Sequence, residues 1–402
     1  MFRKLGLCIL VLSILIIRIN TTAQTTVTLT VAVSTFDQDR LSTTVFDSFE
    51  AQYSGVQVEM VDPGDSIFIT SIDNNVEDHL DDIAYYASQA DVLPLSPWHL
   101  SSVMTRAGYL LNLQPLVNSD PTFDANSYQS TILQSYQWDG GLWALPTTAD
   151  LLMFDYIPSA FDNAGLTYPE SSWTIDTIAD TARALAVRDA NNNVVTPGFW
   201  TASKATLFRA LLGIGFDNPT AFPGQPDYSN PELARTMQIW AELERENVVA
   251  QTEGINPDQI PFRVSYLGSL NQQTNRMASL LIGNTAGISS EGYMVSGGTQ
   301  HPDLAYQLAR YITINPDFLA LSFNPIPAHS GMNSIRDDLQ PLVDTALTNA
   351  IGFGQWRYFY GVGQALDTMV NTSISATEAL IQADLTVRND LQIAELRLNE
   401  PF

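Results

Sequence analysis

Carboxylates and aromatic rings are the side chains of this 402-residue chain best suited to chemistry, since it has only four histidines and one cysteine. His79, His99, His301 and His329 are scattered, without the paired spacing of a zinc site. There is no G-x-S-x-G motif and no phosphate-binding glycine loop. Cys8 lies in an N-terminal apolar run, so the rest of the chain has no thiolate ligand, disulfide or cysteine nucleophile. The sequence predicts no metal, no cofactor and no catalytic residue of these kinds.

The acidic residues leave one enzymatic class open. The chain has 43 Asp and Glu residues, and a glycosidase needs only two carboxylates placed on either side of a glycosidic bond. Trp and Tyr faces beside Asp, Asn or Arg are equally suited to holding a sugar without cleaving it. A secreted glycoside hydrolase that uses a carboxylate pair is therefore the alternative to a binding protein.

The overall charge excludes other partners. The formal net charge is −25, with only 18 Lys and Arg residues. Nucleic acids and anionic membrane surfaces both require a basic face on the protein. We therefore expect neither kind of partner.

The N-terminus has the pattern of an export signal. Arg3 and Lys4 precede an apolar run over residues 5–17, and small residues at 21–23 favour cleavage after Ala23. The run is shorter than the roughly 20 residues that a membrane span needs. We expect an exported protein, periplasmic or at the cell surface, with a retained anchor as the alternative.

The first part of the mature chain predicts a parallel sheet covered by helices. Residues 27–33 and 56–60 alternate apolar and polar positions as strands do, and apolar residues at helical spacing lie between them. A third strand at 89–95 is followed by a helix at about 97–107. This β-α-β-α order is typical of an α/β domain, and the chain length favours two domains.

The later part of the chain is rich in helix patterns, which argues against an all-β adhesion module. Asp139-Gly140-Gly141 predicts a hairpin turn between Trp138 and Leu142, so Asp139 is a turn residue and not a catalytic acid. Residues 250–287 give no clear pattern. Helices are expected at 126–136, 173–187, 204–213, 231–246 and 376–396.

Four ordered stretches, supported by a closing helix, resemble one known family. They are "VTLTVAV…FEAQYSGVQVEMV", "YQWDGGLWALPTTADLLMFDYIPSAFDNAGL", "GYMVSGGTQHPDLAYQLARYIT" and "NPIPAHS", with "ISATEALIQADLTVRNDL" as the closing helix. Together they are similar to extracellular solute-binding proteins of family 1, the maltose-binding-like proteins of ABC transporters. The resemblance extends over nearly all of the mature chain.

The resemblance implies a two-lobed, periplasmic-binding-protein-like (type II) α/β fold whose chain crosses a hinge more than once. A small ligand, usually a sugar or oligosaccharide, would bind between the lobes, and the monomeric protein would deliver it to the transmembrane subunits of an ABC permease. The implied division is a signal peptide at 1–23, lobe 1 at 24–148 plus 289–326, and lobe 2 at 149–288 plus 327–402.

The chain departs from the family pattern in two places. Tyr156-Ile157-Pro158 stands where the family usually has an Asn after the crossing-strand Tyr. The region 250–287 is short and lacks the usual "G..AM" stretch, which normally contributes to the second lobe and its binding wall.

Three candidate ligand contacts follow predicted strands. Asp37 and Asp39 lie in "STFDQDR" after the first strand, where open α/β sheets bind ligands, or they act as N-caps of the next helix. Trp98 follows the third strand, as a contact or a packing residue.

The resemblance points to six more contacts. Asp150 lies in the expected crossing at 147–151 into the second lobe. Phe359 and Tyr360 match the aromatic pair that stacks on sugar in this family, and Trp356 is one turn earlier. Trp200 resembles an aromatic cleft position, and Tyr293 stands where the chain returns to the first lobe. All five aromatic residues are core residues in the alternative interpretation.

Overall fold

The computed structural model describes most of the mature chain. The described residues are 26–64, 76–95, 102–213, 227–250, 256–270, 273, 275–330, 335–352, 356–372 and 374–397. The predicted signal peptide and Trp98 lie outside them. Trp356, Phe359 and Tyr360 belong to a described helix, but their side chains are outside the described part.

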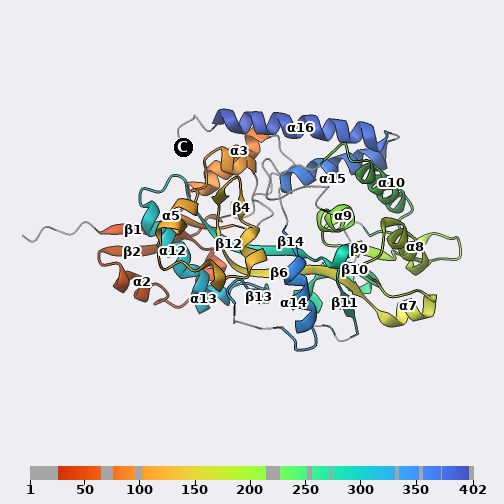
Figure 1. Cartoon of the computed structure of the whole chain (residues 1–402), viewed down its shortest axis with the longest axis horizontal. Coiled ribbons are helices and arrows are strands. Elements are labelled where there is room, and N and C mark those ends of the chain that lie inside the picture. Colours follow the sequence, from red (N-terminus) through yellow and green to blue (C-terminus); the bar gives the residue numbers. More distant parts are fainter. Residues whose placement is uncertain are drawn as a thin grey trace, which may run out of the picture.

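One mixed sheet of ten strands organises the described chain (Figure 1). Its main path runs β2-β1-β3-β12-β6-β10-β9, and three short strands are added to it, β11 and β13 on β6 and β14 on β12. The bounds are β1 Val27–Ala32, β2 Val56–Val61, β3 Val92–Leu95, β6 Leu145–Tyr156, β9 Phe199–Thr201, β10 Phe262–Tyr266, β11 Met277–Ser279, β12 Gly287–Val295, β13 Ile326–Pro327 and β14 Ile351–Gly352.

The predicted parallel arrangement at the start of the chain is confirmed. β1 pairs in parallel with both β2 and β3. The helix expected from about residue 41 is instead a short α1 (Thr35–Gln38), a series of turns and α2 (Asp47–Gln52). Ser34 caps α1 by accepting a hydrogen bond from the Asp37 N–H, which starts the helical conformation earlier than the apolar spacing indicated.

Helices enclose two separate hydrophobic cores. The first core includes Leu29, Ile83 and Leu308, and the second includes Phe208, Trp240 and Phe262. The remaining α-helices are α3 Val76–Ala87, α4 Ser102–Arg106, α5 Gln114–Ser119, α6 Ser130–Gln134, α7 Pro158–Ala164, α8 Ile175–Leu185, α9 Lys204–Leu212, α10 Pro231–Arg245, α11 Leu267–Leu270, α12 Pro302–Ile314, α13 Pro316–Leu319, α14 Gln340–Asn349, α15 Trp356–Asn371 and α16 Ala376–Arg397.

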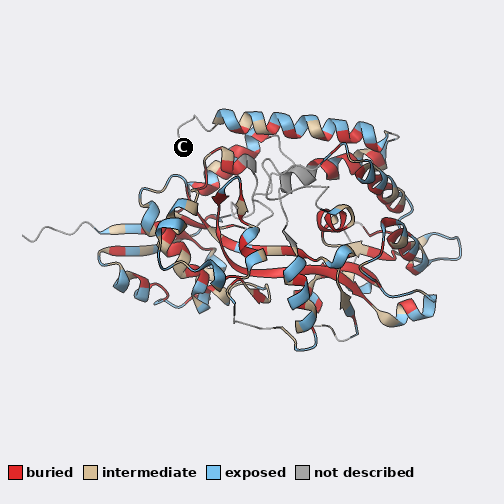
Figure 2. Ribbon diagram, in the orientation of Figure 1, coloured by how far each residue is buried: buried red, intermediate tan, exposed pale blue. Residues whose placement is uncertain are grey.

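The long strand β6 joins the two cores, and all 12 of its residues are buried (Figure 2). Leu151 and Met153 belong to the first core, whereas Leu152 and Phe154 belong to the second. Antiparallel pairing ties β6 to β12 near its start and to β10 near its end. The connection between the cores is therefore a hydrogen-bonded sheet and not a free linker.

The three expected crossing points lie side by side in this sheet. Ala149 of β6 is the pairing partner of Ser290 in β12 and of Ile326 in β13. The lobe boundaries drawn at these points stay a prediction. Helix α16 also connects the two halves, since it contacts α10 and α15 near one end and α3 and α4 along the other (Figure 1).

Two local predictions had different outcomes. The hairpin at Asp139 is confirmed: β4 (Gln137–Trp138) pairs with β5 (Gly141–Leu142), and Asp139 and Gly140 both have positive φ, at 51° and 70°. The unclear region 250–287 contains β10, α11 and β11, which are too short to give a periodic signal. A second hairpin joins β7 (Val187–Arg188) and β8 (Val194–Thr196).

Candidate functional site

The loop after β1 brings charged and aromatic side chains to the carboxyl end of a parallel strand. Asp37 accepts hydrogen bonds from the Ser34 hydroxyl at 2.9 Å and from Arg40 Nη1 at 3.0 Å. Asp39 is exposed and stands at the C-terminal end of α1. The N-cap interpretation of both aspartates is therefore wrong, because Ser34 precedes them and caps the helix itself. Their role as ligand contacts stays a prediction.

Arg40 connects this loop to the segment after α13. Its guanidinium donates to the carbonyl oxygens of Ala320 and Leu321, at 2.9 and 3.3 Å. The guanidinium carbon also lies 5.6 Å from the Phe36 ring centroid and 5.9 Å from that of Phe323. Two segments that are far apart in the sequence are thereby held together.

Phe36 and Phe323, called the aromatic pair below, are unusually open to solvent. Phe36 is 70% exposed and Phe323 is 88% exposed. The sequence reasoning missed both, although Phe36 lies inside the loop that it singled out. An exposed ring cannot be distinguished from a core ring by residue type alone, so only the structure identifies this pair.

Glu291 extends the group toward the crossing strands. It lies at an irregularity in β12, where the pairing with β6 shifts between Glu291 and Gly292. Its side chain is exposed, yet its pKa is raised, chiefly by loss of hydration and further by the charge of Asp37. A hydrogen bond with Ser322 acts in the opposite direction and lowers the pKa.

Hydroxyl groups link Glu291 and the loop after α13 to β6. Thr147 donates to the Glu291 carbonyl oxygen at 3.1 Å, and Thr148 donates to the Ser322 hydroxyl at 2.8 Å. The group around the aromatic pair is therefore anchored on the strand that joins the two cores.

Asp150 lies on the same strand but is buried, with 5% of its surface exposed. Its carboxylate accepts hydrogen bonds from the Leu151 N–H at 2.7 Å and from the Gly268 N–H at 3.1 Å. Burial raises its pKa from 3.8 to about 7, although these backbone donors act in the opposite direction. A Cβ atom on Gly268 would lie 2.8 Å from the carboxylate and 3.7 Å from the Phe323 carbonyl oxygen, so the two loops meet here.

The other described candidates lie at different distances from this group. Tyr293 is two residues beyond Glu291 on β12, partly exposed, with its ring centroid 5.9 Å from that of Phe318. Burial raises its pKa. Trp200 is on β9 and pairs with Arg263 of β10, so one strand separates it from β6. A ligand role for either residue stays a prediction.

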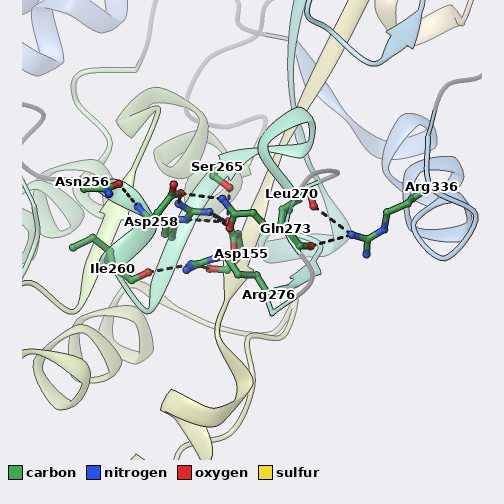
Figure 3. Close-up of polar contacts among 10 residues, drawn as sticks. Asp155, Asn256, Asp258, Ile260, Ser265, Leu270, Gln273, Arg276 and Arg336 are labelled. Carbon is green, nitrogen blue, oxygen red and sulfur yellow. Dashed lines mark hydrogen bonds and ion pairs between the residues drawn. The ribbon is translucent and has the colours of Figure 1, made fainter.

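A second polar cluster lies at the far end of β6, and its contacts are drawn in Figure 3. It contains three buried charged side chains, those of Asp155, Arg263 and Arg276. Asp155 accepts hydrogen bonds from Arg263 Nε at 2.8 Å, from the Ser265 hydroxyl at 2.8 Å, and from Arg276. Arg263 also pairs with Asp258 at 2.8 Å. The cluster fixes the segment that contains β10, α11 and β11 onto β6, which is a structural role that the unclear sequence pattern did not reveal.

Two further properties bear on function. Within the described residues, no group of three or more His, Cys, Asp or Glu side chains is arranged to hold a metal ion. No helix in that part of the chain is long and apolar enough to cross a membrane.

Comparison with known proteins gives a fold but no close relative. No family model matches the sequence, and no curated protein matches it. Solved structures do match. An ABC substrate-binding protein from Listeria monocytogenes, Lmo0181 in complex with cycloalternan, is 15% identical with a TM-score of 0.62, and the match covers 90% of this chain and 99% of that one.

Two other solved structures resemble the chain to a similar degree. An ABC transporter solute-binding protein from Agrobacterium vitis with bound D-mannitol is 17% identical, with a TM-score of 0.57 and coverage of 91% and 99%. UgpB from Mycobacterium tuberculosis in complex with glycerophosphocholine is 14% identical, with a TM-score of 0.60 and coverage of 91% and 98%. The chain therefore has the two-lobed α/β fold of these substrate-binding proteins.

Proposed function

We propose that this protein is the extracellular solute-binding component of an ABC importer and that it binds a sugar or oligosaccharide between its two lobes. The observation that carries this proposal is the aromatic pair with its polar neighbours, at the meeting point of the loop after β1, the loop after α13 and the strand that joins the cores. The match to substrate-binding proteins over 90% and 91% of the chain supports it.

The chemistry of this group suits a polyhydroxylated ligand. Aromatic faces pack against the apolar side of a sugar ring, and carboxylates and hydroxyls accept or donate hydrogen bonds to its OH groups. Phe36 and Phe323 supply the faces, and Asp37, Glu291 and Thr148 supply polar atoms. The contacts predicted from the sequence are part of the same proposal: Asp39, Trp98, Asp150, Trp200, Tyr293, Trp356, Phe359 and Tyr360.

The proposed mechanism is closure of the two lobes around the ligand. A hinge motion is driven by contacts that the ligand makes in the closed form and not in the open one. The neighbouring crossing points at Ala149, Ser290 and Ile326 are where such bending would occur. The closed monomer would then dock on the transmembrane subunits of a permease.

The proposal includes export. The pattern at residues 1–23 supports a signal peptide cleaved after Ala23, which would put the mature protein in the periplasm or at the outer cell surface. A non-enzymatic role is favoured because the matched proteins are substrate-binding proteins.

The decisive experiment is a ligand screen on the mature chain, residues 24–402. A ligand that binds only the folded state raises the melting temperature. The size of this rise depends on the ratio of the ligand concentration to the dissociation constant. We expect a thermal shift and calorimetric heat with one class of mono- or oligosaccharide. The absence of any response to a broad sugar panel contradicts the proposal, and release of reducing ends from a polysaccharide would instead favour the glycoside hydrolase.

A further inference from the structure

The surroundings of the aromatic pair are strongly acidic. Asp37 and Asp39 lie on or beside the same short helix as Phe36. Asp62, directly after β2, accepts a hydrogen bond from Thr35, and this bond and one from the Gly64 N–H lower its pKa. Glu291 lies close enough to Asp37 for the Asp37 charge to raise its pKa. Four carboxylates thus belong to the loop that contains Phe36 or interact with residues of that loop.

Among the described residues, the only cationic side chain with a given contact to this group is that of Arg40. Its guanidinium already has partners. Arg40 pairs with Asp37 and donates further guanidinium bonds to two backbone carbonyls. It offsets one negative charge, so the group keeps an excess of negative charge. The Ser322 side chain is hydrogen-bonded to Glu291, and Glu291 forms no ion pair with another described residue.

The rings themselves favour positive charge. The face of an aromatic ring attracts a cation within about 6 Å of its centroid. The Arg40 guanidinium makes this contact with both Phe36 and Phe323. Much of each ring stays open to solvent, which leaves ring surface for a second cationic group from outside.

We propose that the solute carries a cationic amino or quaternary ammonium group and that this group binds at the aromatic pair beside Glu291 and Asp37. This inference rests on the proposed function, since it names the class of solute for the same site. An amino sugar or a short amino-oligosaccharide combines the required positive charge with hydroxyl groups for the polar neighbours. Phosphorylated and carboxylated solutes are disfavoured by the same charges.

The test uses oligosaccharides of equal length that differ in charge. Calorimetry on the mature chain compares oligomers of glucosamine, of N-acetylglucosamine and of glucose, in a buffer acidic enough to protonate the amines, with choline as a cation that is not a sugar. We expect the glucosamine oligomer to bind at least about tenfold more tightly than its acetylated counterpart.

The outcomes separate the two proposals. Equal binding of charged and neutral oligosaccharides overturns this inference and supports the proposed function. Binding of choline with no binding of any oligosaccharide supports the cationic class and overturns the sugar. No binding of any probe overturns both.

Two variants test the residues. Glu291→Gln keeps the shape of the side chain, and we expect it to reduce the preference for the amino oligomer about tenfold. The matched control is Glu395→Gln, which makes the same change at an exposed glutamate of α16 and should leave the preference unaltered. Phe323→Leu removes the ring but keeps an apolar side chain, and it should also reduce the preference. An unchanged preference in both site variants, with unchanged melting temperatures, overturns the proposed placement.

Discussion

Asp155 and Arg263 face each other across β6 and β10, and both side chains are almost fully buried. Arg276 binds the same carboxylate from the side of β11. Two arginines on two different segments therefore depend on one aspartate, which makes Asp155 the central residue of the second half of the sheet.

Replacing Asp155 should destabilise the protein strongly. Asp155→Asn leaves two buried guanidinium groups without this counter-charge, and breaking a buried pair costs about 3–5 kcal/mol. Urea unfolding followed by circular dichroism measures the change. Asp258→Asn is the matched control because Asp258 is largely exposed, and its loss should cost less than about 1 kcal/mol. Equal effects of the two substitutions would contradict the central role of Asp155.

Asp150 should make stability depend on pH. Because its pKa in the folded protein is raised to about 7, the folded state holds the Asp150 proton more tightly than the unfolded chain does. This contribution to stability is complete below the unfolded pKa of 3.8, is lost as the pH rises toward 7, and changes little above that.

Asp150→Asn and Asp150→Ala test this dependence by urea unfolding at about pH 5 and about pH 8, on either side of the raised pKa. Both remove the titrating group, so the wild type should lose more stability between the two pH values than either variant. Asn keeps an acceptor for the Gly268 N–H, whereas Ala leaves that donor unpaired at a cost of about 1–3 kcal/mol. A wild type with the same pH profile as both variants would show that Asp150 titrates normally.

Replacement of glycine by alanine should change the stability of the protein in opposite directions at two positions. A Cβ atom on Gly198 would lie 1.9 Å from the Ala182 carbonyl oxygen, so Gly198→Ala must displace backbone and should cost more than about 2 kcal/mol. Gly363 is inside α15, and among the described residues no atom beyond the helix's own backbone lies within 4 Å of such a Cβ, so Gly363→Ala should stabilise by about 0.5–1 kcal/mol. Denaturation midpoints of the two variants give the comparison, and a shift in the same direction for both would contradict it.

The aromatic pair should be required for ligand binding. Phe36→Ala and Phe323→Ala each remove a stacking face, and we expect the dissociation constant of a sugar ligand to rise about tenfold or more. Tyr85→Ala is the control, because Tyr85 is a 60% exposed aromatic residue on a different element, α3. Calorimetry measures the three constants, and unchanged affinity in both Phe variants would rule out this site.

The sequence predicted features that depend on neighbouring residues. Alternating apolar positions identified β1 and β2, and Asp139-Gly140 identified a hairpin whose two turn residues need positive φ. The family resemblance predicted the two-lobed fold, which the structural matches bear out.

The features that were missed depend on long-range packing. Arg263 interrupts the apolar pattern of β10 and Arg276 directly precedes β11, and only their pairing with Asp155 explains why charged residues are buried there. Phe36 and Phe323 come together through Arg40, a contact that no local pattern indicates. Sequence periodicity reports which residues are apolar, but not which of them remain exposed.

Because β6 contributes residues to both cores and β12 pairs along the first half of β6, neither half of the protein is expected to be a practical unit for separate production. Expression of one half alone would cut β6 or leave the pairing edge of β12 open, and an open strand edge invites aggregation. Circular permutants or inserted reporter domains should therefore be placed in exposed turns, such as the one at Asn192 between β7 and β8, and not at the junction of the lobes.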